Sequence, residues 1–260
     1  MKLKDKIIVV TGAGSGIGKA LVAKFIAEQA KAVVAVDINA ENVRQTATEL
    51  GCVAMAADVT NEQDVLRVID ETESSIGPID LFCSNAGVLT GFSEQSPNTE
   101  WQLCWDVNVM SQVYAARHLV PRMIKRGSGY FLHTASAAGL LNQIGGAAYA
   151  ASKHAAVGFT EWLAMTYAHK GIKVSMLCPQ AVRTAMTDQV EDLDAMQAAA
   201  GDGMMEPGQL ADIVVEHLER DAFLILTHPE VETYMQRKSA DYERWIGGMN
   251  RLQCKLTGAS

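Results

Sequence analysis

The sequence predicts an α/β fold in which helices cover both faces of a doubly wound parallel sheet. Short apolar runs alternate with helical stretches along the chain, and these stretches have roughly the dozen or more residues that a crossover between parallel strands needs. The runs are apolar almost throughout, as expected for strands that are covered on both faces. No linker, repeat or low-complexity segment interrupts the chain, so residues 1–260 are predicted to form one domain.

The predicted strands and helices alternate up to residue 180. The strands are residues 6–10, 31–37, 51–58, 79–87, 129–136 and 171–180. The helices are residues 19–30, 40–50, 61–75, 99–126 and 147–170. Beyond them, an apolar run at 223–226 precedes Pro229, which suits the first turn of a helix. Residues 228–257 are therefore predicted to form a C-terminal helical extension.

The first strand leads directly into a glycine-rich turn, TGAGSGIG at residues 11–18, and then into a helix. Glycines in such a turn let a pyrophosphate approach backbone N–H groups at the positive end of the helix. The spacing of Gly12, Gly16 and Gly18 differs from the general G-x-G-x-x-G fingerprint, since Ile17 stands between the last two. A tight turn without a ligand is the alternative, but the strand–turn–helix context favours dinucleotide binding in a Rossmann-like fold.

The second strand ends in Asp37, nineteen residues after Gly18, where an acid is expected to meet the adenosine ribose hydroxyls. A carboxylate there would accept hydrogen bonds from both hydroxyls and repel a 2′-phosphate, so NAD rather than NADP is the expected cofactor. Asp37 could instead merely cap the next helix. Asp58, at the end of the third strand, is likewise either an adenine contact or a helix-initiating acid.

Tyr149 and Lys153 stand four residues apart in the predicted helix 147–170, so their side chains share one face, one turn apart. A free tyrosine titrates near pH ~10, which is too high for a general base at neutral pH. A nearby ammonium favours the phenolate and lowers the pKa of the tyrosine. Ser136, at the end of a predicted strand, offers a hydroxyl that could hold the oxygen of a substrate. These residue types predict a proton-transfer site for an alcohol/ketone couple.

The residues with chemical functions fall at the carboxyl ends of different predicted strands, which is the edge where ligands bind in parallel α/β sheets. They are Gly12, Asp37, Asp58, Asn85, Ser136 and Pro179. Because these strand ends meet at one edge, we expect a single site.

Over roughly residues 5–185 the chain resembles the short-chain dehydrogenase/reductase family. The resemblance rests on TGAGSGIG at 11–18, Asp58-Val59, SNAG at 84–87, Asn108, Ser136, the Tyr149-x3-Lys153 pair, Pro179 and Thr184. It implies that Tyr149 is the general acid/base and that Lys153 holds the nicotinamide ribose. It also implies that Ser136 binds the reacting oxygen and that Asn108 fixes a water in a proton relay.

The resemblance further implies a set of cofactor contacts along the carboxyl edge of the sheet. Besides Tyr149 and Lys153, they are Gly12, Ser15, Gly16, Ile17, Gly18, Asp37, Asp58, Val59, Asn85, Ala86, Gly87, Pro179, Val182 and Thr184. Among these, the backbone around Val182 and the Thr184 hydroxyl would hold the nicotinamide carboxamide.

The chain departs from the family pattern in three places. Ser84 replaces the first Asn of the usual NNAG turn, and its hydroxyl is expected to make some of the same hydrogen bonds. Gln180 replaces a Gly, where it either donates a hydrogen bond to the substrate or points to solvent. The extension 228–257 carries an apolar stripe that packs on its own domain or a neighbouring subunit, or else borders the substrate pocket.

Residues 181–206 follow the sixth strand and are predicted to lie over the site as a substrate lid. Their methionines would give an adaptable apolar lining, although some could be ordinary core residues. The methionines are Met186, Met196, Met204 and Met205, and the expected further walls are Leu89, Phe92, Leu140, Leu141 and Ile144.

Composition excludes several other classes of function. A net charge of −8 and a pI of about 5.3 disfavour binding to nucleic acid or to an anionic membrane, which usually needs a basic face. No stretch approaches the ~18 apolar residues of a membrane span, and the N-terminus lacks a signal-peptide pattern, so a cytoplasmic location is expected. The five cysteines are odd in number and scattered, which favours neither disulfides nor a metal site.

We therefore expect an NAD-dependent oxidoreductase that acts on a mostly apolar secondary alcohol or its ketone. A steroid, an alicyclic or aromatic alcohol, or a fatty acyl derivative would fit. One alternative is a ketoreductase that works mainly in the reductive direction. Another is a non-catalytic NAD-binding sensor, against which the intact set of Ser136, Tyr149, Lys153 and Asn108 argues. The resemblance also implies a homodimer or homotetramer.

Overall fold

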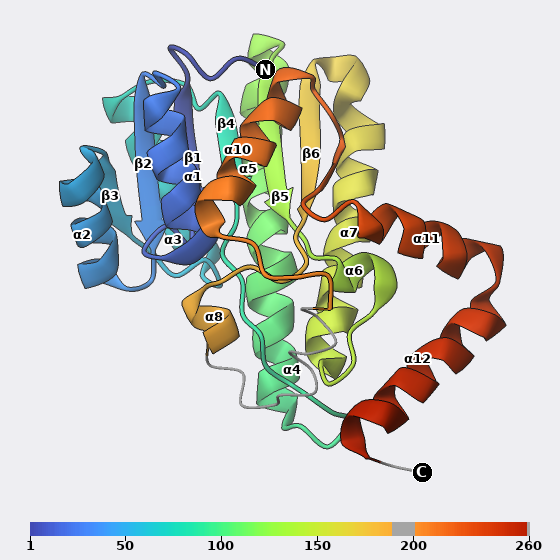
Figure 1. Ribbon diagram of the computed structural model, residues 1–260. Coiled ribbons are helices and arrows are strands. Elements are labelled where there is room, and N and C mark those ends of the chain that lie inside the picture. Colours follow the sequence, from blue (N-terminus) through green and yellow to red (C-terminus); the bar gives the residue numbers. More distant parts are fainter. Residues whose placement is uncertain (189–200, 259–260) are drawn as a thin grey trace.

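The structure, a computed structural model that describes residues 1–188 and 201–258, is built on a seven-stranded parallel sheet (Figure 1). The strand order is β3-β2-β1-β4-β5-β6-β7, so the chain winds outward from β1 in both directions. The strands are β1 (Ile7–Thr11), β2 (Ala32–Asp37), β3 (Val53–Ala56), β4 (Leu81–Ser84), β5 (Gly129–Thr134), β6 (Ile172–Cys178) and β7 (Leu224–Leu226). This confirms the predicted doubly wound α/β fold.

The helices follow the predicted crossovers. In the first part of the chain they are α1 (Gly16–Ala27), α2 (Ala40–Leu50), α3 (Glu62–Ser75), α4 (Asn98–Trp105) and α5 (Ser111–Arg126). Then come α6 (Ala138–Leu141), α7 (Ala147–Tyr167), α8 (Ala185–Asp188), α10 (Pro207–Glu219), α11 (Glu230–Ala240) and α12 (Tyr242–Thr257). A 3-10 turn, η2 (Ala168–Lys170), follows α7.

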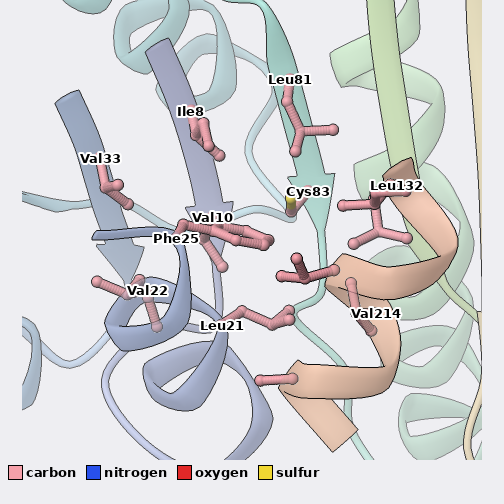
Figure 2. Close-up of a cluster of buried hydrophobic side chains, with 14 of the residues drawn as sticks. Ile8, Val10, Leu21, Val22, Phe25, Val33, Leu81, Cys83, Leu132 and Val214 are labelled. Carbon is pink, nitrogen blue, oxygen red and sulfur yellow. The ribbon is translucent and has the colours of Figure 1, made fainter. Parts of the chain in front are cut away.

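Alternate side chains of the strands enter two separate cores, because successive residues of a strand point to opposite faces of the sheet. Ile8 and Val10 of β1 pack with Leu21 and Phe25 of α1 and Val214 of α10 (Figure 2). Val9, which lies between them, belongs instead to the cluster formed with α3, α5 and α7. The sheet is therefore covered on both faces, as its apolar strands predicted.

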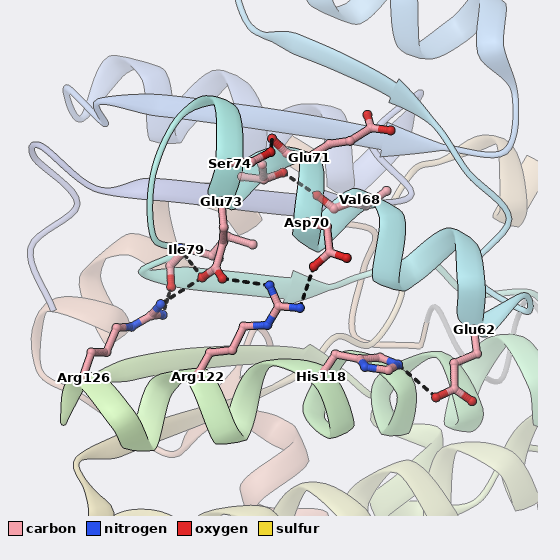
Figure 3. Close-up of polar contacts among 11 residues, drawn as sticks. Glu62, Val68, Asp70, Glu71, Glu73, Ser74, Ile79, His118, Arg122 and Arg126 are labelled. Atoms are coloured by element: carbon pink, nitrogen blue, oxygen red, sulfur yellow. Dashed lines mark hydrogen bonds and ion pairs between the residues drawn. The ribbon is translucent and has the colours of Figure 1, made fainter.

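A row of ion pairs ties α3 to α5 at the surface (Figure 3). Arg122 bridges Asp70 and Glu73 at 2.6 and 3.0 Å, and Arg126 reaches Glu73 at 2.9 Å. Partial burial opposes ionisation of Glu73, but the hydrogen bonds from Arg122, the Ile79 N–H and Arg126 outweigh it and lower the pKa of this carboxyl. The contacts fix α5, and with it the segment before α5 that carries Asn108.

Two predicted helices are interrupted. The segment 99–126 is one continuous run of helix, but residues Asp106–Met110 form a π-helical turn, η1, between α4 and α5. Such turns are rare and frequently occur at functional sites. The extension 228–257 forms two helices, because Asp241 leaves the helical conformation and caps α12 by accepting a hydrogen bond from the Arg244 N–H at 2.9 Å.

Three helices were not predicted from the sequence: the one-turn helices α6 and α8, and the longer α10. Helix α10 begins at Pro207 and has a capping box between Glu206 and Gln209. Proline in the first turn is a known signal of a helix start, as is Gln three residues after the N-cap, and apolar residues follow at helical spacing. Among the described residues, no helix is both long enough and apolar enough to cross a membrane.

Candidate active site

A cavity of about 450 Å³ opens at the carboxyl edge of the sheet, beyond the ends of β1, β4, β5 and β6. Apart from Asn108, every residue that the sequence analysis assigned to the catalytic or cofactor site lines this cavity. As the strand-end rule predicted, residues from segments that are far apart in the sequence gather at this one edge.

The glycine turn fits tightly against the neighbouring backbone. A Cβ atom on Gly18 would lie 2.0 Å from the carbonyl oxygen of Gly12, and one on Gly12 would lie 2.8 Å from Cα of Ala86. Gly12 and Gly16 also have positive φ angles of 66° and 51°, which side chains disfavour. The turn thus forms a cradle of bare backbone before the N-terminus of α1, which is what a pyrophosphate needs.

Asp37 holds this turn from the end of β2. Its Oδ2 accepts a hydrogen bond from the Gly14 N–H at 2.8 Å, and its Oδ1 accepts one from the Asn39 N–H at 2.9 Å. Helix α2 is capped by Asn39, whose side chain accepts from the N–H groups of Glu41 and Asn42. The capping alternative for Asp37 is therefore wrong, and its carboxylate lies fixed at the cavity wall.

Asp58 does not cap a helix either. Its Oδ1 accepts hydrogen bonds from the backbone N–H and the hydroxyl of Thr60, while Asn61 caps α3. Asp58 and Val59 both line the cavity, next to Ala57 at the end of β3.

Asn85 links the ends of three strands. Its Nδ2 donates to the Thr11 carbonyl oxygen at 3.0 Å, and its Oδ1 accepts from the Thr134 hydroxyl at 3.2 Å. The Thr11 hydroxyl accepts from the N–H groups of Asn85 and Ala86. Ser84 does not share in these bonds, because its buried Oγ has no partner among the described residues. The expectation that this hydroxyl replaces turn hydrogen bonds was wrong.

Ser136, Tyr149 and Lys153 come together at the wall of the cavity, between β5 and α7. The Tyr149 phenol is hydrogen-bonded to Ser136, and the Lys153 ammonium lies 5.7 Å from the centroid of the Tyr149 ring. Lys153 Nζ donates to the Thr134 carbonyl oxygen at 3.0 Å. The proximity predicted from the four-residue spacing is present.

The pKa values differ from the expected direction. Burial raises the pKa of Tyr149, although its hydrogen bond with Ser136 acts the other way. Burial also lowers the pKa of Lys153 to about 8. Desolvation of the phenol is therefore the dominant influence on the pKa of Tyr149, which the local charge argument did not include.

Asn108 lies behind the cavity wall in the π-helical turn η1 and is fully buried. Its Oδ1 accepts from the Val88 N–H at 3.0 Å, and its Nδ2 donates to the Val88 carbonyl oxygen and to Ser152 Oγ. A Cβ on Gly87 would lie 3.3 Å from Asn108 Oδ1 and 3.5 Å from Lys153 Nζ, so both side chains border the same glycine. Asn108 therefore joins the segment after β4 to helix α7.

Thr184 closes the cavity opposite the glycine turn. A Cβ on Gly16 would come within 3.0 Å of the Thr184 methyl group. Thr187, which sequence analysis missed, donates its hydroxyl to the carbonyl oxygens of Val182 and Thr184 and so shapes this loop. The remaining predicted residue on this side, Pro179, lines the cavity and accepts a hydrogen bond from the Ala137 N–H at 2.7 Å.

The substrate side of the cavity is mostly apolar. Its walls include Leu89, Phe92, Leu103, Val107 and Met186. Three expected walls do not line it: Leu140 and Leu141 pack with Val231 of α11, and Ile144 is not among the lining residues. Met204 does not line the cavity either, and Met205 packs with the core cluster of α1 and α10. Met196 and the rest of residues 189–200, within the predicted lid 181–206, lie outside the described residues.

In the C-terminal extension, the first helix packs on the domain and the second projects away from it. Helix α11 contacts α6 through Val231, Tyr234 and Met235, and Lys238 Nζ donates to the Leu140 carbonyl oxygen at 2.7 Å. Helix α12 has no buried residue and projects from the body of the molecule (Figure 1). Since α6 directly follows Ser136, α11 both packs on its own domain and lies close to the site.

Comparison with known proteins agrees with this geometry. A family model described as short chain dehydrogenase matches residues 6–195. The 1-deoxy-11-beta-hydroxypentalenate dehydrogenase of Streptomyces exfoliatus is 34% identical over 255 residues, which are 95% of this chain and 91% of that protein. The cyclohexanol dehydrogenase of Acinetobacter sp. is 31% identical over 231 residues, which are 86% of this chain and 92% of that protein.

A crystal structure of a short chain dehydrogenase/reductase from Burkholderia phymatum in complex with NAD is similar throughout. It has a TM-score of 0.85 at 28% identity and covers 94% of this chain and 96% of that chain. The sequence match, the fold and the residues gathered around the cavity lead to one conclusion. The chain belongs to the short-chain dehydrogenase/reductase family and is an oxidoreductase that acts on CH–OH groups.

Proposed function

We propose that the protein oxidises a mostly apolar secondary alcohol to its ketone with NAD as cofactor and Tyr149 as general acid/base. One observation carries the proposal. The hydrogen-bonded Tyr149 and Ser136 share a cavity with the glycine cradle and the fixed carboxylate of Asp37. Proton transfer and dinucleotide binding are thereby joined in one site.

Asp37 supports the choice of NAD over NADP. Both of its oxygens are held by backbone N–H groups, so the negative charge stays at the end of β2. A 2′-phosphate at the adenosine ribose would face this charge, whereas free ribose hydroxyls would donate to it. The complex of the Burkholderia phymatum relative with NAD also supports the choice.

The bound cofactor would supply hydride acceptance at its nicotinamide ring, and the side chains would handle the proton. Ser136 Oγ would hold the reacting oxygen of the substrate, and Tyr149 Oη would take the hydroxyl proton. Lys153 would bind the nicotinamide ribose hydroxyls, and Asn108, fixed by Val88 and Ser152, would support a proton path behind Lys153. The apolar wall around Leu89 and Phe92 would exclude water from the carbinol carbon.

The apolar wall also supports an alicyclic or similarly compact apolar substrate. The names of the relatives from Streptomyces exfoliatus and Acinetobacter sp. describe dehydrogenases of a pentalenate and of cyclohexanol, both of which are cyclic. A cavity of about 450 Å³ has room for such a ring system beside the nicotinamide.

The test is an NAD⁺-reduction assay over chiral apolar secondary alcohols, run also with NADP⁺ and, on the matching ketones, in the reductive direction. Tyr149→Phe keeps the ring and removes the hydroxyl, so we expect turnover to fall by about 10²- to 10⁴-fold with NAD still bound. Near-normal turnover of this variant would show that Tyr149 is not the acid/base. If the ketones are reduced with NADPH faster than the alcohols are oxidised with NAD⁺, the ketoreductase alternative is favoured.

A further inference from the structure

Two of the departures from the family pattern, Gln180 and the C-terminal extension, are joined by hydrogen bonds. Gln180 Nε2 donates to Asp202 Oδ2 at 3.0 Å, and the Tyr234 hydroxyl donates to Asp202 Oδ1 at 2.9 Å. Gln180 follows β6, Asp202 lies before the bridge between Val182 and Met205, and Tyr234 lies on α11. Asp202 therefore links three separate segments of the chain. This link holds the side chain of Gln180, which lines the cavity.

The carboxylate of Asp202 fixes which way the Gln180 amide faces. A carboxylate can only accept hydrogen bonds, so the NH₂ group of Gln180 must face it. The hydrogen bond to Asp202 raises the pKa of Tyr234, so this phenol stays protonated and remains a donor. Oε1 of Gln180 is thus turned away from Asp202.

The main chain of Gln180 is anchored as well. Its N–H donates to the Thr227 hydroxyl at 3.4 Å, and that hydroxyl is 2.9 Å from His228 Nδ1. Thr227 and His228 are both buried and lead directly into α11. The residue is therefore positioned at both its main chain and its side chain.

Oε1 of Gln180 is buried and has no hydrogen-bond partner among the described residues. A buried acceptor without a donor is unfavourable, and most such atoms in proteins are satisfied by a partner, a water or a ligand. Gln180 lines the same cavity as Ser136 and Tyr149, where the neighbouring walls are apolar. A donor carried by the substrate would satisfy this oxygen.

We propose that Gln180 determines specificity by accepting, through Oε1, a hydrogen bond from a second donor group of the substrate. The inference rests on the proposed function and narrows it: the substrate is an apolar secondary alcohol that carries a further hydroxyl or N–H group. Asp202 and Tyr234 act as positioning residues, because they hold the amide in the orientation that presents Oε1.

Matched pairs of substrates test the proposal, with cyclohexanol against the 1,2-, 1,3- and 1,4-cyclohexanediols as probes. For at least one diol, the wild type should show a kcat/KM about tenfold above that for cyclohexanol, since one good hydrogen bond corresponds to such a ratio. Gln180→Met keeps the length of the side chain and removes the acceptor, so this ratio should fall to about one. Thermal unfolding of the variant shows that it is folded.

The positioning role is tested by Tyr234→Phe, which removes only the hydroxyl that binds Asp202. The ratio of diol to cyclohexanol should fall about threefold, with the change mainly in KM, since the amide becomes free to turn. Tyr242→Phe is the matched control, because Tyr242 is an exposed tyrosine on α12 for which the structure gives only a contact with Lys238. It should leave the ratio unchanged.

An unchanged ratio in Gln180→Met, with kcat/KM lowered equally for every alcohol, would overturn the proposal. A tenfold rise in the dissociation constant of NAD in Gln180→Met, with the ratio of diol to cyclohexanol unchanged, would also overturn it. Gln180 would then bind the cofactor rather than the substrate. Failure of the proposed function looks different: the wild type itself would oxidise no alcohol of the panel, and this inference would fall with it.

Discussion

The two ends of the cavity are built in different ways. At the cofactor end, the glycine turn, Asp37 and Asn85 are held by hydrogen bonds to backbone atoms, and bare glycines pack against backbone. At the substrate end, Gln180 is held by the side chain of Asp202, which is held in turn by Tyr234 of another segment. The cofactor end thus tolerates few substitutions, because they disturb backbone packing. The substrate end can be altered by exchanging side chains. This difference suits a family with one cofactor chemistry and many substrates.

Gly18→Ala should give the largest effect, since it attacks the backbone packing of the cofactor end. The new Cβ would lie 2.0 Å from the Gly12 carbonyl oxygen, and neither atom can move without opening the turn. We expect the free energy of unfolding to fall by about 3 kcal/mol or more and NAD affinity to fall at least about a hundredfold. Urea unfolding and calorimetric titration with NAD measure the two.

Gly208→Ala is the matched control, because a Cβ there meets nothing within 4 Å and the residue lies exposed in α10. It should leave NAD binding unchanged and raise stability by up to about 1 kcal/mol. Equal effects of the two substitutions would contradict the claim that backbone packing defines the cofactor end.

Asp37→Ser should give the next largest effect, because it removes the fixed charge at the end of β2. Loss of hydrogen bonds to the ribose hydroxyls weakens NAD, and loss of the repulsion strengthens NADP. We expect the ratio of kcat/KM values for NAD over NADP to fall by about ten- to a hundredfold. Glu41→Ser changes net charge equally at an exposed position on α2, and should leave the ratio as it is.

Lys153→Met tests a residue of the catalytic site and should change stability less than Gly18→Ala does, and in the opposite direction. Burial lowers the pKa of Lys153 to about 8, from an ordinary value of 10.5. Below pH 8 folding must bury the ammonium, so the uncharged variant should be more stable by about 2 kcal/mol at pH 7, after loss of the bond to Thr134. The same variant should lose most of its turnover.

The stability advantage of Lys153→Met over the wild type should decrease as pH rises. Between about pH 8 and 10.5 the folded wild type has released the Lys153 proton while the unfolded chain retains it, so wild-type stability gains on that of the variant as pH rises. Urea unfolding at pH 7 and pH 10 should show the advantage of Lys153→Met shrinking. A constant advantage would mean that packing rather than charge is responsible.

The same division explains what the sequence could predict. The glycine turn and Asp37 were predictable because their geometry follows from neighbouring residues: a strand, a turn and a helix in direct succession. The Tyr149–Lys153 pair was predictable because helical spacing alone brings the two together. The doubly wound parallel sheet followed from the alternation of strands and helices, which leaves few topologies.

The substrate end was not predictable in this way. Gln180 contacts a residue 22 positions away and Asp202 contacts one 32 positions away, and no periodicity announces either pair. Leu140 and Leu141 were apolar and close to Ser136 in sequence, yet they pack against α11. The direction of the Tyr149 pKa also depended on tertiary burial, which a local charge argument does not contain. Helix α10 is a different case from the substrate end: it was not predicted, although the signals of its start were present in the sequence.

The sheet order also has a consequence for how the protein assembles. The cradle is complete only when β1 lies beside β4, and Asn85 then bonds to Thr11 across 74 positions of sequence. Contacts of such long range close large loops and slow the search for the native state. No short fragment contains the proposed dinucleotide site, so a ligand bound there would shift the equilibrium of the whole fold. NAD should therefore slow hydrogen exchange in β1, β4 and β5 together rather than in the glycine turn alone.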